Sequence, residues 1–281
     1  MTKTFVLGLG AQKAGTTWVR EYLRVSDRFA GGLRKEYHVF DTLDVEQVRW
    51  RAARIREEAR AELDQAGAGE ATGGVALQVA AMVARPSLYF TFFCGLLAQD
   101  GVDVTGDFTP DHALLPTRRL RDIKRRFAVR GVRTVGVFVM RDPVERTVSA
   151  IRMRQRYNPG ELPDDLAEAV LGWHADPAFS SRSDYAPTLA AIEGAFDPDE
   201  ALVAFYEELF TPQTVERLCA LTGLDPHPPD FEERSNASGG EASLPDDVRR
   251  VVARHHAHVY EAVAGATGRD VARLWPSASL L

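Results

Sequence analysis

A lysine and two threonines that follow an apolar segment near the start of the chain have the spacing of a phosphate-binding loop. The segment FVLGLG, residues 5–10, is followed by AQKAGTTW, which contains Lys13, Gly15, Thr16 and Thr17. Glycines let the backbone turn tightly against an anion, and the first N–H groups of a following helix point at it. The spacing therefore predicts a buried strand, an anion-binding loop and a helix that begins at Thr16 or Thr17.

This loop differs from two common nucleotide-binding loops. A Walker A loop places its lysine directly after its last glycine, whereas Lys13 comes two residues before Gly15. A dinucleotide-binding loop needs a glycine three residues after Gly10, and that position is Lys13. The sequence therefore favours neither an ATP loop nor a Rossmann dinucleotide site.

A second candidate anion site follows another apolar segment, residues 135–139. Arg141 comes just after this segment, and Ser149 follows eight residues later. Asp142 can cap the next helix with Pro143 in its first turn, and about two helical turns then bring Ser149 to a face that Arg141 can approach. An arginine fork with a hydroxyl donor suits a terminal phosphate, although an ordinary capped helix would also explain this sequence.

Glu36 and His38 are the candidates for a general base, the group that takes the proton of a reacting hydroxyl or amine. They lie two residues apart in RKEYHVFD, residues 34–41, and they point to the same side if this segment is extended. The alternative is a structural role, in which Glu36 pairs with Lys35 or Arg34 at the surface and His38 is a packed histidine.

Together these segments resemble the sulfotransferases that use 3′-phosphoadenosine 5′-phosphosulfate (PAPS). QKAGTTW resembles their 5′-phosphosulfate loop, RDPVERTVS their 3′-phosphate motif, and RKEYHVFD the KE-x-HFFD segment of glycosaminoglycan-type and related bacterial members. VDVTGDFTP resembles their GE-x-TP element, with Asp107 where glutamate is usual and Phe108 where some carbohydrate sulfotransferases carry lysine. LVAFYEELF, residues 202–210, looks like the family's late strand and acidic turn.

The resemblance implies an α/β protein with a three-layer, P-loop-like fold, in which helices flank a mostly parallel central sheet. It implies one sulfotransferase domain over residues 1–281, with a mainly helical insert at about 42–99. PAPS would be the co-substrate, no metal would be needed, Glu36 would act as base beside His38, and Lys13 would stabilise the leaving group. The expected donor-binding residues are Gln12, Lys13, Ala14, Gly15, Thr16, Thr17, Trp18, Arg141, Ser149 and Tyr185.

The composition is consistent with a single domain and disfavours several other classes. The 281 residues are 45% hydrophobic and carry a formal net charge of −6, which argues against a nucleic-acid binder and requires any anion site to be local. Cys94 and Cys219 show neither a disulfide framework nor a metal-ligand spacing. The N-terminal segment has no basic leader and no long apolar span follows it, so we expect a cytoplasmic protein without a membrane span.

Two other functions stay open. A Mg²⁺-dependent P-loop nucleotide phosphotransferase would hold its metal through Thr16 or Thr17 and an aspartate after an apolar strand, and the sequence offers no convincing aspartate of that kind. A non-catalytic nucleotide-binding protein is the third possibility.

If the chain is a sulfotransferase, the expected acceptor is a small molecule, a carbohydrate or a natural product. SNASGG, residues 235–240, is either a loop over the 3′ side of the nucleotide or a linker.

Overall fold

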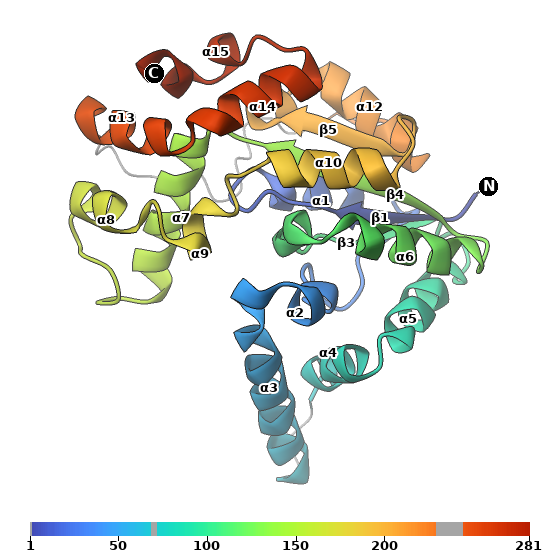
Figure 1. The fold of residues 1–281 in the computed structure, drawn as a ribbon. Helices are drawn as coiled ribbons and strands as arrows, with labels where there is room; N and C mark the ends of the chain where they lie inside the picture. The colour runs from blue at the N-terminus through green and yellow to red at the C-terminus, as the bar shows by residue number, and fades with distance from the viewer. Residues whose placement is uncertain (1, 69–71, 229–243) are drawn as a thin grey trace.

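The computed structural model describes residues 2–68, 72–228 and 244–281, which form a parallel sheet with helices on both faces (Figure 1). The strands are β1 (Thr4–Gly8), β2 (Phe29–Ala30), β3 (Val104–Asp107), β4 (Arg133–Met140) and β5 (Ala201–Phe205). Their order across the sheet is β2-β3-β1-β4-β5, and every neighbouring pair is parallel. The expected three-layer α/β fold with a mostly parallel sheet is thus confirmed.

The order of the strands places a ligand-binding crevice between β1 and β4. After β1 the chain moves to one side of the sheet, to β2 and β3, and after β4 it moves to the other side, to β5. In such sheets the connections diverge at this point and leave a crevice beyond the carboxyl ends of the strands. The two predicted anion-binding segments directly follow β1 and β4, so both lie at this crevice.

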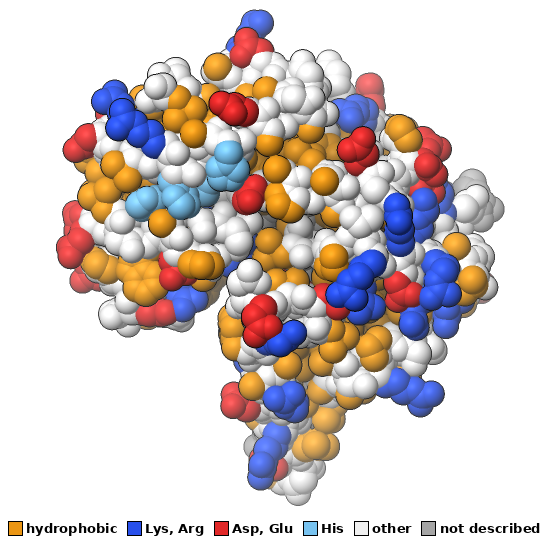
Figure 2. Space-filling view, in the orientation of Figure 1, with side chains coloured by type: hydrophobic (Ala, Val, Ile, Leu, Met, Phe, Trp, Pro, Cys, Tyr) orange, Lys and Arg blue, Asp and Glu red, His pale blue; other side chains and the backbone are white. Residues whose placement is uncertain are grey.

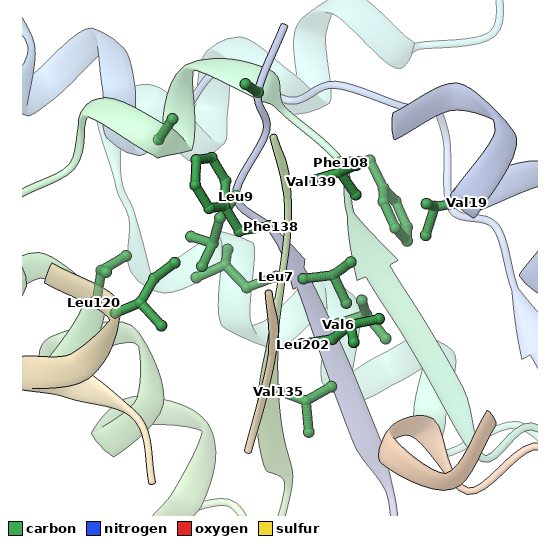
Figure 3. Close-up of a cluster of buried hydrophobic side chains, with 14 of the residues drawn as sticks. Val6, Leu7, Leu9, Val19, Phe108, Leu120, Val135, Phe138, Val139 and Leu202 are labelled. Atoms are coloured by element: carbon green, nitrogen blue, oxygen red, sulfur yellow. The ribbon is translucent and has the colours of Figure 1, made fainter. Parts of the chain in front are cut away.

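The central strands β1 and β4 are mostly apolar because both of their faces are covered. Phe5, Val6 and Leu7 of β1 are fully buried, as parallel strands between two helical layers require. Figure 3 shows Leu120 of α6 on one side of the strands and Val19 of α1 on the other. The strands and helices thereby form the three layers.

The helices have the following bounds. They are α1 (Thr16–Arg24), α2 (Phe40–Asp44), α3 (Trp50–Gly67), α4 (Val75–Ala84), α5 (Ser87–Leu97), α6 (Thr117–Ala128), α7 (Pro143–Tyr157), α8 (Leu166–Trp173), α9 (Pro177–Ser180), α10 (Ala186–Ala195), α11 (Tyr206–Leu209), α12 (Pro212–Thr222), α13 (Asp246–His255), α14 (Ala257–Thr267) and α15 (Val271–Leu274), with 3₁₀ turns η1 (Glu46–Val48), η2 (Pro110–Leu114) and η3 (Pro276–Leu280). Within the described parts of the chain, none of these helices has the length and apolar character needed to cross a bilayer.

The segment between β2 and β3 is helical and has two parts. Helices α3 and α4 pack on each other and project away from the sheet (Figure 1). Helix α5 instead packs against β3 and buries Tyr89, Phe90 and Phe93 in the core. These aromatic side chains therefore serve packing, and the chain breaks at Pro86, where the proline prevents the helix from continuing.

Candidate functional site

The segments that follow β1 and β4 share one cavity of about 360 Å³. The side chains around it are mostly charged and aromatic. The basic ones are Lys13, Lys35, Arg51, Arg141 and Arg156, and the acidic ones are Glu36 and Asp111. On the face drawn in Figure 2, acidic and basic side chains both occur. A chain with a net charge of −6 therefore concentrates positive charge in one cavity, as an anion site requires.

The loop after β1 has the geometry of an anion-binding loop. Its backbone stays bonded to β4, since the N–H groups of Leu9 and Ala11 donate to Val137 and Val139 at 2.7 and 2.8 Å. Gly15 has a φ of 90°, a left-handed conformation that favours glycine, and α1 begins at the next residue, as predicted. No side chain caps the start of α1 among the described residues, so its first N–H groups are available to an anion.

Lys13 carries its ammonium group in the cavity among like charges. Burial lowers the pKa of Lys13, and the positive charges of Arg141, Arg156 and Lys35 lower it further. A bound anion would act against these causes, because a nearby negative charge stabilises the protonated form of Lys13. The cavity is therefore electrostatically prepared for a highly charged anionic ligand.

Arg141 is fixed at the edge of the same cavity. Its Nη1 donates to the backbone oxygen of Lys13 at 3.1 Å, and its guanidinium lies 4.6 Å from the centre of the Tyr206 ring. Asp142 caps α7 by accepting from the Val144 N–H at 2.9 Å, which confirms the predicted helix start. Ser149, two turns into α7, lines the cavity with Arg141.

Most of the predicted catalytic and donor-binding residues meet at the cavity, and three of them lie behind it. Those that line it are Gln12, Lys13, Gly15, Thr16, Thr17, Trp18, Glu36, Arg141 and Ser149. Ala14 is fully buried beneath the loop. Tyr185 is also buried, and its hydroxyl donates to the Arg141 backbone oxygen at 2.7 Å, so it holds Arg141 in place. His38 lies behind Glu36.

Glu36, His38 and Asp41 form a chain of contacts that leads from the cavity into the core. His38 Nε2 lies 3.3 Å from Glu36 Oε2, and His38 Nδ1 lies 2.7 Å from Asp41 Oδ2. An extended segment would place Glu36 and His38 on the same side, but the segment turns at His38, which has a φ of 54°. Thr109 Oγ1 causes this turn by accepting from the Tyr37 and His38 N–H groups at 2.9 and 3.2 Å.

These contacts set opposite charges on Glu36 and His38. Burial acts to raise the pKa of Glu36, but the hydrogen bond from His38 and the charge of Lys35 outweigh it and lower this pKa to about 2. Burial acts to lower the pKa of His38, but the hydrogen bonds to Asp41 and Glu36 outweigh it and raise this pKa to about 9. At neutral pH the pair is therefore a carboxylate held by an imidazolium.

Lys35 connects the anion-binding loop to Glu36. Its Nζ donates to Thr17 Oγ1 at 2.7 Å, to Thr16 Oγ1 at 3.3 Å and to Glu36 Oε1 at 3.0 Å. The pairing of Glu36 with Lys35 that the structural alternative assumed is thus present, but it lies in the cavity. Arg34 pairs instead with Glu58, at 3.8 Å.

Asp111 and two arginines form a buried cluster that the sequence analysis missed. Arg182 Nε donates to Asp111 Oδ1 at 2.7 Å, and Arg51 Nη2 donates to Asp111 Oδ2 at 3.1 Å. Burial acts to raise the pKa of Asp111, but the arginine charges outweigh it and lower this pKa. Ligand atoms of Asp111, His38 and Asp41 lie within 4.8 Å of one another, as in a metal site, yet the two arginines oppose any cation there.

An aromatic wall, formed by Trp18, Tyr206 and Phe210, was only partly predicted. The Phe210 ring lies 5.2 Å from the Trp18 ring and 5.4 Å from the Tyr206 ring, and all three line the cavity. Tyr206 and Phe210 belong to LVAFYEELF, the segment that resembles the family's late strand and turn, so this signal was available. Such a wall can stack against a purine base.

Comparison with known proteins supports the fold. No family model matches the sequence, and no curated protein matches it. The structure is similar to that of a sulfotransferase from Alicyclobacillus acidocaldarius, with a TM-score of 0.65, 18% sequence identity and 98% of each chain covered. At this identity the similarity shows that the two chains share a fold and does not establish a shared activity.

Two more distant similarities complete the comparison. A sulfotransferase domain from the curacin biosynthetic pathway has a TM-score of 0.42 and 16% identity, with 80% of this chain and 75% of that one covered. A sulfotransferase domain of the Synechococcus PCC 7002 olefin synthase has a TM-score of 0.42 and 13% identity, with 90% and 93% covered. At this distance neither similarity carries an argument.

Proposed function

We propose that this chain is a PAPS-dependent sulfotransferase. The observation that carries the proposal is the meeting of two predicted anion-binding elements and one partly buried carboxylate, Glu36, in a single cavity. PAPS has two separate anionic groups, a 5′-phosphosulfate and a 3′-phosphate. Lys13 and the loop N–H groups suit the first, Arg141 and Ser149 suit the second, and the aromatic wall suits the adenine.

The proposed reaction is an in-line transfer of the sulfonyl group. The acceptor oxygen forms a bond to sulfur while its proton passes to Glu36. The bond between sulfur and the bridging oxygen breaks, and its electron pair stays on that oxygen, which becomes part of the 5′-phosphate of adenosine 3′,5′-bisphosphate. Lys13 and the loop N–H groups stabilise the negative charge that develops there, as in phosphoryl transfer.

Glu36 is the better candidate for the base. It lines the cavity, whereas His38 is buried behind it. With its pKa raised to about 9, His38 is protonated at neutral pH and has no free lone pair for an acceptor proton. We assign His38 and Asp41 the role of holding the Glu36 carboxylate toward the acceptor.

The acceptor would enter beside Glu36, between Arg51 and Asp111 on one side and α7 on the other. On α7, Met153, Arg156 and Tyr157 line this part of the cavity. A hydroxyl of a carbohydrate or other natural product is the acceptor class we propose. Since Arg51 belongs to α3, the helical segment at about 42–99 would form part of the acceptor wall within a single domain.

A Mg²⁺-dependent phosphotransferase is the second candidate, and one contact disfavours it. In P-loop enzymes the hydroxyl that follows the loop binds Mg²⁺. Here the hydroxyls of Thr16 and Thr17 accept hydrogen bonds from the Lys35 ammonium, so a positive charge already lies where that metal would bind.

Calorimetric titration with adenosine 3′,5′-bisphosphate, and with ADP in the presence and absence of Mg²⁺, tests the donor class. We expect tight binding of the bisphosphate that does not depend on metal. Preference for ADP with Mg²⁺ would instead indicate a phosphotransferase, and binding of neither nucleotide would contradict both proposals. Bisphosphate binding without turnover of PAPS in a broad acceptor screen would favour the non-catalytic alternative.

A further inference from the structure

Lys35 is the cavity residue whose side chain reaches both the anion-binding loop and the proposed base. Its ammonium has three hydrogen-bond donors, and the structure gives each one a partner: Thr16, Thr17 and Glu36. On the basis of the function proposed above, we propose that Lys35 binds the sulfonyl group of PAPS and so distinguishes the sulfonated donor from the desulfonated product.

The proposed role of Lys35 follows from where its ammonium lies in the order of groups along an in-line transfer. The 5′-phosphate lies on the loop, the acceptor oxygen lies next to Glu36, and the sulfur lies between them. A single ammonium group within hydrogen-bond distance of both Thr17 Oγ1 and Glu36 Oε1 therefore lies beside the sulfonyl oxygens.

The backbone holds Lys35 in this place independently of its side chain. The Lys35 carbonyl accepts from the Phe108 N–H at 3.0 Å, which ties the segment to the end of β3. Two residues further on, Thr109 fixes the Tyr37 and His38 N–H groups. Because these bonds are made by the main chain, removing the Lys35 side chain leaves the segment and Glu36 anchored.

The partners of Lys35 also explain how the hydrogen bonds that it donates can change during the reaction. The threonine hydroxyls accept from Lys35, so their own hydrogens remain available to donate to an anion. Sulfonyl oxygens carry more negative charge than hydroxyls and would replace them as acceptors for one or two Lys35 donors. After transfer the product has no sulfonyl group, Lys35 returns to the threonines, and the product is held less tightly than the donor.

Binding of PAPS and of adenosine 3′,5′-bisphosphate, measured by calorimetry without any acceptor, tests this role in the full chain. In Lys35→Met we expect the affinity for PAPS to fall about 10- to 100-fold, the loss typical of a charged hydrogen bond, while that for the bisphosphate changes less than about threefold. Lys35→Arg should recover part of the PAPS affinity, and thermal unfolding of each variant reports its folding.

Arg156→Met is the matched control, because it also removes one positive charge from the cavity. The charge of Arg156 acts on Lys13 through space, without a hydrogen bond between the two side chains. This variant should therefore lower the affinities for both ligands by similar factors. Equal losses for the two ligands in Lys35→Met, or no loss for either, would overturn the role of Lys35. Failure of the unmodified chain to bind both ligands would instead overturn the proposed function itself.

Discussion

The two sides of the cavity are built in different ways. On the donor side, Lys13 and Arg141 belong to segments that directly follow β1 and β4, so the adjacent strand positions each of them. On the acceptor side, Asp111 bonds to Arg51 and Arg182, which are 60 and 71 residues away in the sequence. The donor side thus depends on local motifs at the sheet, whereas the acceptor side depends on long-range ion pairs between separate segments.

Because the two sides are built differently, substitutions on each side should affect different properties of the protein. A change on the acceptor side should alter turnover or stability and leave the nucleotide bound. A change on the donor side should weaken the nucleotide.

Glu36→Gln should have the largest effect on turnover. Loss of a general base lowers rates by about 10²- to 10⁴-fold, and the amide cannot take the acceptor proton. Turnover of PAPS with an acceptor found by screening measures this effect, and affinity for the bisphosphate should not change. Glu46→Gln, in the exposed 3₁₀ turn η1, is the control. Full activity of Glu36→Gln together with loss of activity in His38→Gln would identify His38 as the base.

Asp111→Asn should have the largest effect on stability. It leaves the buried guanidinium group of Arg182 and the partly buried one of Arg51 without a carboxylate, and breaking a buried ion pair costs about 3–5 kcal/mol. Urea unfolding measures the loss, with Asp225→Asn as an exposed control. If the variant stays folded, it should still bind the bisphosphate. An unfolding free energy equal to that of the unmodified chain would show that this cluster does not hold the acceptor side together.

Arg141→Lys should lower the affinity for the bisphosphate about 10- to 100-fold. Lysine keeps the charge but loses the planar fork that reaches the Lys13 carbonyl and stacks on Tyr206. Calorimetric titration measures the change, and Arg125→Lys on the exposed side of α6 is the control. Unchanged affinity would remove Arg141 from the proposed 3′-phosphate site.

The last expected effect is a pH dependence of stability that comes from His38. Its folded-state pKa of about 9 lies above the ordinary 6.5, so its contribution is complete below pH 6.5 and is lost as the pH rises through 9. Glu36, with a lowered pKa, loses its contribution only below about pH 4.5, outside this range. The difference in unfolding free energy between the unmodified chain and His38→Gln should therefore shrink by about 3 kcal/mol between pH 6 and 10. A constant difference would contradict the imidazolium assignment.

The sequence predicted the fold and the meeting of the segments after β1 and β4 because that information is local. An apolar strand, a glycine turn and a helix start lie within a few residues of Lys13, and the same is true of the cap and proline beside Arg141. Tyr185 was placed in the nucleotide site, yet its ring is buried behind Arg141. The segment at residues 235–240, for which a loop over the nucleotide and a linker were the alternatives, lies outside the described residues.

The acceptor side could not be predicted in the same way. Arg51 belongs to α3, a helix rich in charged residues, and no pattern in the sequence connects it to Asp111. His38 adopts its left-handed conformation only because Thr109, 71 residues away, accepts from its N–H group. Contacts of this kind appear only once the chain has folded.

The basic cavity of an otherwise acidic chain also has a kinetic consequence. An anionic ligand at a distance meets the net charge of −6 and is repelled, and it is attracted only when it comes close to the cavity. Dissolved salt screens charges over about 8–10 Å at physiological ionic strength, so it reduces the distant repulsion more than the attraction at contact. Encounter of the donor with this protein should therefore be slowed little by salt, unlike the capture of polyanions by a broadly basic surface.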